Sequence, residues 1–375
     1  MRTKTDIYEV YGLTPEQREQ LAEVASVFAF QAPEYYLSLI DWDDPADPIR
    51  RIIIPDPAEL RHGGEFDPCD EAANFVAPGL QHKYSDTVLL LATDTCAGLC
   101  RYCFRKRLFV DDADVLEHGA DETVPSNEVA RNPGPALEYI RSHPGISNVL
   151  LTGGDVLTLG TTRLAALLEE LREIPHIKVI RLGSRMPVFN PYRILNDPEL
   201  VKTIRRVSTN QRRVYLVTHF DHPREITDLS SAAVAQFINH GIPVVNQNPI
   251  LSGVNDDPGV LRELFSELNS IGVAPYYLFL VRPTFGNRDF QVPIARTFEL
   301  LTEAEYGLSG LEKRVRLVMS HASGKIEVVG MDREYIYMRY QRARNYEDHG
   351  RFMVFERDDD ACWLEDLDLV SSSAA

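Results

Sequence analysis

The sequence contains little cysteine and little tryptophan, with 5 and 2 of these residues in a chain of 375. It also has no surplus of positive charge, because 39 Lys and Arg stand against 56 Asp and Glu, giving a formal net charge of −17. An acidic chain without a basic tail is a poor general binder of nucleic acid, since phosphate contacts need Lys and Arg. We therefore expect no nucleic-acid partner.

Long hydrophobic runs are also missing. No stretch approaches the ~20 apolar residues that span a bilayer, and residues 1–21 contain no apolar run of signal-peptide length. We therefore expect a cytoplasmic protein without a membrane partner. In such a reducing compartment a cysteine cluster favours metal binding or redox chemistry over disulfides.

Short apolar segments alternate with helical stretches between residues 86 and 290. Each expected strand ends in a polar or glycine-containing tip: 87–93, 146–155, 177–185, 212–220, 242–251 and 273–281. Six strand–helix units predict parallel strands in an α/β fold, and six suit a partial (β/α)6 barrel better than a closed eightfold one.

The two ends of the chain have different patterns. Residues 1–85 are predicted to be mostly helical, with Thr14 as the N-cap and Pro15 in the first position of a helix. Residues 291–375 are predicted to form a short C-terminal α+β extension, with a hairpin whose turn lies near Gly324. The chain thus divides into three predicted parts: 1–85, 86–290 and 291–375.

Three of the five cysteines, Cys96, Cys100 and Cys103, follow the first expected strand with the spacing C-x3-C-x2-C. Ligands of parallel α/β proteins bind at the carboxyl ends of the strands, which is where this loop begins. A structural zinc site needs four ligands, and Cys69 and Cys362 are remote. Three thiolates instead leave one corner of a cubane iron–sulfur cluster open. The tight spacing disfavours three merely structural cysteines.

This cysteine motif, with the aromatic Tyr102 before its last member, resembles the signature of the radical S-adenosylmethionine (SAM) superfamily. The resemblance implies a partial radical SAM barrel, a [4Fe–4S] cluster on the three cysteines, and SAM bound at its open iron. The segment LLTGGD resembles the glycine-rich SAM segment of that superfamily. It places Gly153 and Gly154 near the SAM amino group, with Asp155 as an acceptor.

Over residues 35–330 the chain more narrowly resembles the lysine 2,3-aminomutase family, in segments such as CRYCFRKR, VTHFDHPREIT and NQNPILSGVND. That family uses SAM together with pyridoxal 5′-phosphate (PLP), which a lysine holds covalently. A deoxyadenosyl radical takes hydrogen from Cβ of the amino acid, and the amino group migrates from Cα to Cβ. The resemblance therefore implies a PLP-dependent aminomutase, an isomerase.

The resemblance also assigns further roles to residues of this chain. Arg105 matches the arginine for the substrate α-carboxylate, His219 and Gln247 match the SAM pocket, Lys83 and Tyr84 match a pair that grips the PLP phosphate, and Lys325 matches the PLP lysine. Without the resemblance, His219 reads as a structural histidine. Lys106 and Arg107 are expected to be solvated charges.

The chain departs from the family where lysine aminomutases use two aspartates to bind the remote ammonium of lysine. Arg282 replaces one of them, and the segment around Ser320 offers no acid in place of the other. With no nearby acid evident to offset Arg282, we expect a substrate with a second carboxylate, glutamate or aspartate, or a neutral amino acid, rather than lysine. The alternative for Arg282 is a surface or ion-paired arginine.

The C-terminal region departs from the family as well. It contains only Cys362 where full-length members carry zinc-binding cysteines, so a homo-oligomer is possible but does not follow from the family. The expected partners are a small-molecule amino acid and an electron donor such as flavodoxin or ferredoxin. Two alternatives stay open: a radical SAM enzyme with a PLP-independent reaction on a small molecule, and a non-catalytic iron–sulfur redox or sensing protein.

Overall fold

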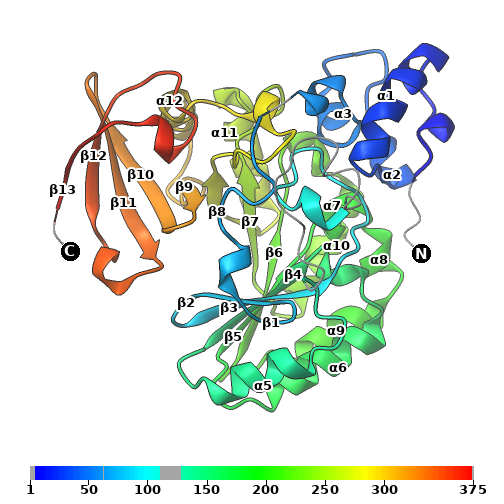
Figure 1. The fold of residues 1–375 in the computed structure, drawn as a ribbon. Coiled ribbons are helices and arrows are strands. Elements are labelled where there is room, and N and C mark those ends of the chain that lie inside the picture. The colour runs from blue at the N-terminus through cyan, green and yellow to red at the C-terminus, as the bar shows by residue number, and fades with distance from the viewer. Residues whose placement is uncertain (1–4, 62, 110–127, 374–375) are drawn as a thin grey trace.

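A computed structural model describes residues 5–61, 63–109 and 128–373. The described strands form one 13-stranded sheet in which each strand pairs with its neighbours in the sequence (Figure 1). The central strands are parallel: β3 (Thr87–Thr93), β4 (Asn148–Gly153), β5 (Val179–Gly183), β6 (Arg213–Thr218), β7 (Val244–Pro249), β8 (Ala274–Phe279) and β9 (Arg316–His321). The predicted α/β class and its six parallel strands are confirmed, and β9 adds a seventh.

Helices connect the parallel strands and cover the sheet with their apolar faces. The longer ones are α5 (Gly134–Ser142), α6 (Thr161–Arg172), α9 (Pro198–Val207), α10 (Asp228–Asn239), α11 (Pro258–Ser270) and α12 (Ile294–Glu305). In α6, Leu164, Leu168 and Leu171 recur at helical spacing and are fully buried. Two short helices follow β5, α7 (Met186–Phe189) and α8 (Tyr192–Leu195).

The N-terminal segment is helical only in part. Its helices are α1 (Pro15–Val27), α2 (Glu34–Leu37) and α3 (Pro48–Ile53). Thr14 caps α1 as predicted, in a capping box in which its hydroxyl accepts from the Gln17 backbone N–H. The end of the segment is a hairpin of β1 (Phe75–Ala77) and β2 (Leu80–Tyr84), because Gly79 adopts φ +72° and reverses the chain.

The C-terminal strands continue the sheet beyond β9 as an antiparallel meander. They are β10 (Gly324–Met331), β11 (Tyr335–Ala343), β12 (Phe352–Glu356) and β13 (Leu369–Ser372). The predicted hairpin is present, with His321 paired to Gly324 at its turn. Because β9 is parallel to β8, the sheet crosses the predicted boundary at residue 290 without a break. The orange and red strands lie at the opposite end of the molecule from the blue helices (Figure 1).

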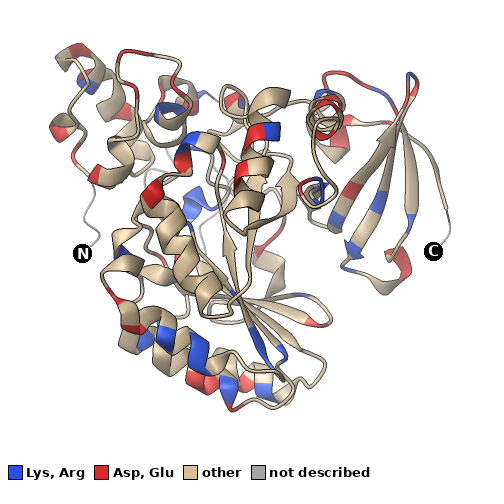
Figure 2. Ribbon diagram, turned by 180° about the vertical axis from the view of Figure 1, so that it is seen from behind, with Lys and Arg blue, Asp and Glu red and all other residues tan. Residues whose placement is uncertain are grey.

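Short 3-10 helices complete the described structure: η1 (Ile7–Glu9), η2 (Pro57–Leu60), η3 (Ala72–Asn74), η4 (Lys106–Phe109), η5 (Val156–Thr158), η6 (Pro223–Glu225), η7 (Arg288–Phe290), η8 (Tyr346–Asp348) and η9 (Leu364–Asp366). Basic and acidic residues are interspersed along the outer helices (Figure 2). Within the described residues, no helix combines the length and the apolar character needed to cross a membrane.

Candidate active site

A cavity of about 380 Å³ lies at the carboxyl ends of the parallel strands. Every site residue predicted from the sequence lines it: Lys83, Tyr84, Cys96, Cys100, Tyr102, Cys103, Arg105, Gly153, Gly154, Asp155, His219, Gln247, Arg282 and Lys325. These residues come from all three predicted parts of the chain. The fold therefore brings them to one place, where a ligand of a parallel α/β protein is expected to bind.

The three clustered cysteines lie in the loop after β3, and the N-terminal segment holds that loop. Gln31 donates to the Cys96 carbonyl over 2.9 Å, and the Arg101 backbone N–H donates to the Ile52 carbonyl over 2.9 Å. Burial raises the pKa of all three thiols, that of Cys100 to about 11. Thiolates at this position therefore need the positive charge of a metal.

The glycine pair at the end of β4 allows close packing against this cysteine loop. Gly153 has φ +119°, and a Cβ atom there would lie 2.2 Å from the Thr93 carbonyl oxygen. A Cβ atom on Gly154 would lie 2.3 Å from the Thr95 carbonyl oxygen. Any other residue would push the two strand tips apart.

Asp155 follows the two glycines, and its carboxylate is already hydrogen-bonded within the protein. It accepts from the Ser184 hydroxyl at 2.6 Å and from the backbone N–H groups of Arg185 and Leu157 at 2.7 and 2.9 Å. The side chain thus ties the tip of β4 to the tip of β5. Its predicted contact with SAM stays a prediction.

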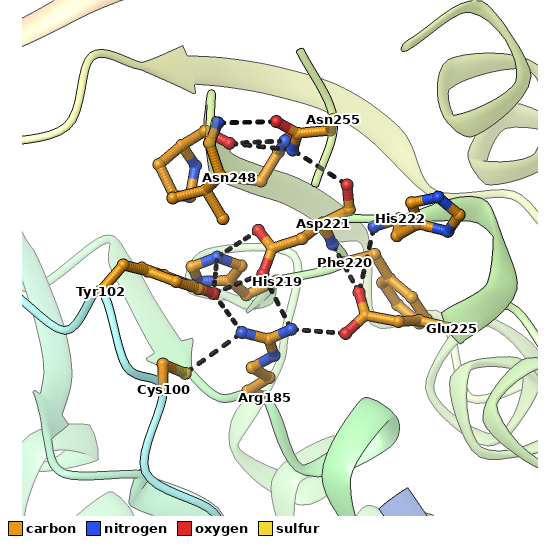
Figure 3. Close-up of polar contacts among 12 residues, drawn as sticks. Cys100, Tyr102, Arg185, His219, Phe220, Asp221, His222, Glu225, Asn248 and Asn255 are labelled. Carbon is orange, nitrogen blue, oxygen red and sulfur yellow. Dashed lines mark hydrogen bonds and ion pairs between the residues drawn. The ribbon is translucent and has the colours of Figure 1, made fainter. Parts of the chain in front are cut away.

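A buried polar network joins the cysteine loop to the tips of β5 and β6 (Figure 3). His219 Nε2 lies 2.9 Å from Asp221 Oδ1 and 3.2 Å from the Tyr102 hydroxyl, which also donates to Asp221. Arg185 Nη2 contacts Asp221 Oδ2 at 2.8 Å and Glu225 Oε1 at 2.5 Å. The network fixes Tyr102 and His219 on the cavity wall.

Arg185 was not predicted as a site residue. Its Nη1 donates to the Cys100 sulfur over 3.1 Å (Figure 3). Burial alone lowers the pKa of Arg185, but Asp221 and Glu225 outweigh burial and raise it well above its ordinary value. The sequence signal that could have found it is its position at the tip of β5, between strand tips that carry other predicted site residues.

The cavity also contains a carboxylate that the sequence analysis missed. Glu71 contacts Arg105 at 3.3 Å, Arg107 at 2.6 Å and Arg282 at 3.2 Å. Burial raises the pKa of Glu71, but the three guanidiniums outweigh burial and hold it well below its usual range. The expectation that no acid offsets Arg282 is therefore wrong. Glu71 precedes Arg105 by 34 residues and Arg282 by 211, and its sequence context gives no sign of either pairing.

Arg282 itself faces the cavity. Its guanidinium carbon lies 3.8 Å from the centroid of the Phe104 ring, and its Nη2 contacts the Ser320 hydroxyl at 3.2 Å. Arg282 and Ser320, the residues around which the resemblance leads us to expect the two aspartates of the family, are thus neighbours in space. Of the alternative reading, a surface or ion-paired arginine, the surface position is excluded because the side chain is only 15% exposed, and the ion pair is present, with Glu71.

Lys106 and Arg107, expected to be solvated, are buried instead. Lys106 Nζ contacts Glu59 at 3.0 Å, and Arg107 Nε contacts Glu128 at 2.8 Å. Arg101 in the same loop pairs with Glu59 at 2.9 Å. These ion pairs explain how an acidic protein can bury several basic residues in one loop, because each buried cation has an acidic partner from another segment.

Lys325 lies on β10, immediately after the turn at Gly324. Its Nζ is 3.7 Å from the centroid of the Tyr277 ring. Burial lowers the pKa of Lys325 well below its ordinary value, and the nearby cations Arg181, Arg342, Arg282 and Lys83 lower it further. This shift favours the uncharged amine, which is the form that attacks carbonyl groups.

Further basic residues surround Lys325, and sequence analysis had identified Lys83 and Arg282 among them. Burial lowers the pKa of Lys83 to about 8. Arg342, from β11, stacks over the Tyr84 ring at 4.3 Å, and Arg181, from β5, also lines the cavity. Tyr84 is buried as well, which raises its pKa to about 12. Such a group of cations around a phenol hydroxyl fits a phosphate group.

The cavity wall also contains buried polar atoms that lack a protein partner. Among the described residues these are Gln81 Nε2, Arg185 Nε and Thr218 Oγ1. Buried polar atoms in folded proteins are nearly always hydrogen-bonded, so their orphan state at a cavity wall fits a polar ligand. Together with three free thiols, they fit the cofactors that the sequence motifs imply.

This fold and cavity define an α/β enzyme that binds its ligands at the carboxyl edge of a parallel sheet. Comparison with known proteins gives the family. The chain is 46% identical over 362 residues to an Aquifex aeolicus protein that carries the provisional name L-lysine 2,3-aminomutase, covering 96% of this chain and 93% of that one. It is 37% identical to L-lysine 2,3-aminomutase of Acetoanaerobium sticklandii, covering 80% and 69%.

A third relative is glutamate 2,3-aminomutase of Clostridioides difficile, which is 34% identical and covers 81% of this chain and 68% of that one. The chain belongs to the lysine 2,3-aminomutase family and is a radical SAM enzyme of the aminomutase class. Membership implies a [4Fe–4S] cluster and SAM. No family model matches the sequence. Among solved structures, a radical SAM methyltransferase from Sphaerobacter thermophilus aligns with a TM-score of 0.40 at 16% identity, over 64% of this chain and 68% of that one.

Proposed function

We propose that this protein is a PLP-dependent amino-acid 2,3-aminomutase that moves the amino group of an acidic amino acid, glutamate or aspartate, from Cα to Cβ. The observation that carries the substrate class is the sharing of one carboxylate oxygen by two cavity arginines. Glu71 Oε1 lies 3.3 Å from Arg105 and 3.2 Å from Arg282. The two groups proposed to bind substrate carboxylates are therefore close neighbours.

The charge balance around Glu71 favours an anionic ligand. Arg107 is neutralised by Glu128 at 2.8 Å, with Asp67 at 3.8 Å. That leaves the single carboxylate of Glu71 to serve both Arg105 and Arg282. A substrate with two carboxylates supplies the missing negative charge, and guanidiniums retain N–H donors beyond those used on Glu71.

A lysine substrate would meet the opposite situation. Of the described residues that line the cavity, the carboxylates are those of Glu71 and Asp155. Glu71 is shared by three guanidiniums, and Asp155 is bonded to Ser184 and to backbone N–H groups. Neither carboxylate is available to a remote ammonium, and Arg282 repels one. A neutral amino acid is compatible with the site but leaves the cationic excess without a partner.

The proposal assigns PLP to the Lys325 end of the cavity. The lowered pKa of Lys325 suits covalent attachment of an aldehyde, and Lys83, Tyr84, Arg181 and Arg342 suit its phosphate. When bound, PLP supplies an electron sink for the migrating amino group. Lys325 holds the cofactor, and Arg105 orients the α-carboxylate of the substrate.

The proposal assigns the cluster and SAM to the other end. Cys96, Cys100 and Cys103 bind the cluster, and the SAM pocket consists of Tyr102, Gly153, Gly154, Asp155, His219 and Gln247. A flavodoxin or ferredoxin supplies the electron, in the cytoplasm. A homo-oligomer is compatible with the proposal and is not required by it.

An anaerobic screen of the twenty amino acids, with reconstituted enzyme, SAM, PLP and a reductant, tests the proposal. Formation of β-amino acids is the readout. We expect turnover of glutamate or aspartate that depends on added PLP. Faster turnover of lysine would contradict the substrate class and leave the chemistry intact. Reactions that proceed fully without PLP would favour the PLP-independent alternative, and absence of SAM cleavage would favour a redox or sensing protein.

A further inference from the structure

We propose that Arg185 sets the reduction potential of the iron–sulfur cluster by donating a hydrogen bond to one of its ligand sulfurs. The inference rests on Cys100 being a cluster ligand, as proposed above. Arg185 Nη1 lies 3.1 Å from Cys100 Sγ, and the same nitrogen donates to the Tyr102 hydroxyl (Figure 3). Arg185 is therefore a positioning residue that acts on the cluster through its ligand.

The guanidinium is held independently of Cys100. Its Nη2 contacts Glu225 at 2.5 Å and Asp221 at 2.8 Å. The guanidinium carbon Cζ lies 4.5 Å from the centroid of the Phe189 ring. Tyr36, from the N-terminal segment, donates a hydrogen bond to Glu225 and so fixes the clamp from behind. These contacts aim one N–H at the sulfur regardless of the oxidation state of the cluster.

The physical consequence is a higher potential. One-electron reduction adds negative charge to the irons and their sulfurs, so an N–H donor on a ligand sulfur stabilises the reduced form more than the oxidised form. The effect comes mainly from the direction of the N–H bond, because Asp221 and Glu225 together offset the net charge of Arg185. A lysine keeps the charge but loses the rigid fork of donors.

The experiment is a redox titration of anaerobically reconstituted full-length protein, followed by the electron paramagnetic resonance signal of the reduced cluster. We expect Arg185→Lys to shift the midpoint potential downward. Arg185→Gln leaves buried carboxylates unpaired, so it is combined with Glu225→Gln. We expect the midpoint potential of the double variant to lie below that of Glu225→Gln alone. Arg101→Lys is the matched control. Arg101 is a buried guanidinium in the cysteine loop that pairs with Glu59, and we expect no shift.

Iron content and the cluster signal of the wild-type protein test the cluster ligands separately from this inference. Fully loaded Arg185 variants with the wild-type midpoint would overturn the role of Arg185 and leave those ligands standing. If the variants do not load iron, wild-type protein labelled with 15N only in the guanidinium groups of arginine decides. We expect a 15N hyperfine coupling to the reduced cluster that persists in Arg105→Lys, and its absence would overturn the inference.

Discussion

Two groups of charged residues in the cavity differ in how their charges are balanced. We call the group around Arg185 and Cys100 the cysteine end, and the group around Glu71, Arg282 and Lys325 the cationic end. At the cysteine end, Arg185 is enclosed by two carboxylates, Asp221 and Glu225, at 2.8 and 2.5 Å. At the cationic end, Glu71 is the carboxylate that contacts Arg105 and Arg282, and burial, together with nearby cations, lowers the pKa of Lys325. The guanidinium of Arg185 is ion-paired within the protein, whereas the cations of the other group, of which Arg342 also pairs with Asp86, outnumber the carboxylates that contact them.

This difference separates two kinds of binding site. Buried cations that outnumber the acids around them cost stability, so a fold retains them where a ligand supplies further negative charge. The cysteine end suits a cofactor held by thiolates and by a preformed polar network. The cationic end suits ligands that bring phosphate and carboxylate groups with them. Variants at each end can break or sharpen this comparison.

The largest expected effect comes from substitutions at the cysteine end. Alanine in place of Cys96, Cys100 or Cys103 is expected to abolish SAM cleavage, because two thiolates do not hold a cubane cluster that has one open corner. Iron analysis after anaerobic reconstitution, with about four irons expected per wild-type chain, and SAM cleavage by dithionite-reduced protein are the measurements. Cys362→Ala is the control and is expected to behave as wild type. A SAM-cleaving Cys100→Ala protein would refute the assignment.

The next effect belongs to the cationic end. Lys325→Ala is expected to lose covalent PLP and aminomutase activity, while SAM cleavage without substrate continues, because the cysteine end does not contain Lys325. Borohydride trapping followed by peptide mass spectrometry locates the attachment site. Lys83→Ala is the control, since it keeps the nucleophile. Trapping of PLP on a lysine other than Lys325 would show that Lys325 is assigned wrongly.

Much of the fold is predictable because each of the strands β3 to β8 has a recognisable local sequence pattern. β3 to β8 are apolar segments that end in polar or glycine tips, and their order places those tips at one edge. The hairpin of β1 and β2 escapes prediction because β1 has only three residues and β2 mixes polar with apolar residues. The turn at Pro78 and Gly79 is the local signal that could have revealed it.

The site is predictable where a residue carries its motif with it, as Cys96 and Gly153 do. Partners that meet only in the folded chain are not predictable in this way. Glu71 meets Arg282 across 211 residues, and Glu59 meets Arg101 across 42. This is why Lys106 and Arg107 looked solvated and Arg282 looked unpaired, since the sequence displays each cation without its distant acid.

A smaller effect tests the substrate class at the cationic end. Arg282→Ala is expected to lower kcat/KM for glutamate or aspartate by at least about tenfold, because a charge-assisted hydrogen bond contributes about 1.5–3 kcal/mol and 1.4 kcal/mol is tenfold. Arg282→Lys, the conservative variant, is expected to recover part of the loss. Arg282→Asp is expected to admit some lysine as substrate. Equal kcat/KM for the wild type and Arg282→Ala would place the carboxylate-binding role elsewhere.

The smallest effect is a pH dependence of phosphate recognition at the same end. Burial lowers the pKa of Lys83 to about 8, so its charge is present below pH 8 and is lost as the pH rises through that value. Phosphate binds the charged form, and the preference of the protein for PLP over pyridoxal is therefore expected to fall between pH 7 and pH 9, by up to about tenfold. The ratio of the two dissociation constants cancels the titration of Lys325, because both aldehydes attach there. Lys83→Arg keeps its charge throughout this range and is expected to hold the ratio constant. A wild-type ratio that does not change with pH would mean that Lys83 takes no part in holding the phosphate, and that Arg181 and Arg342 hold it without Lys83.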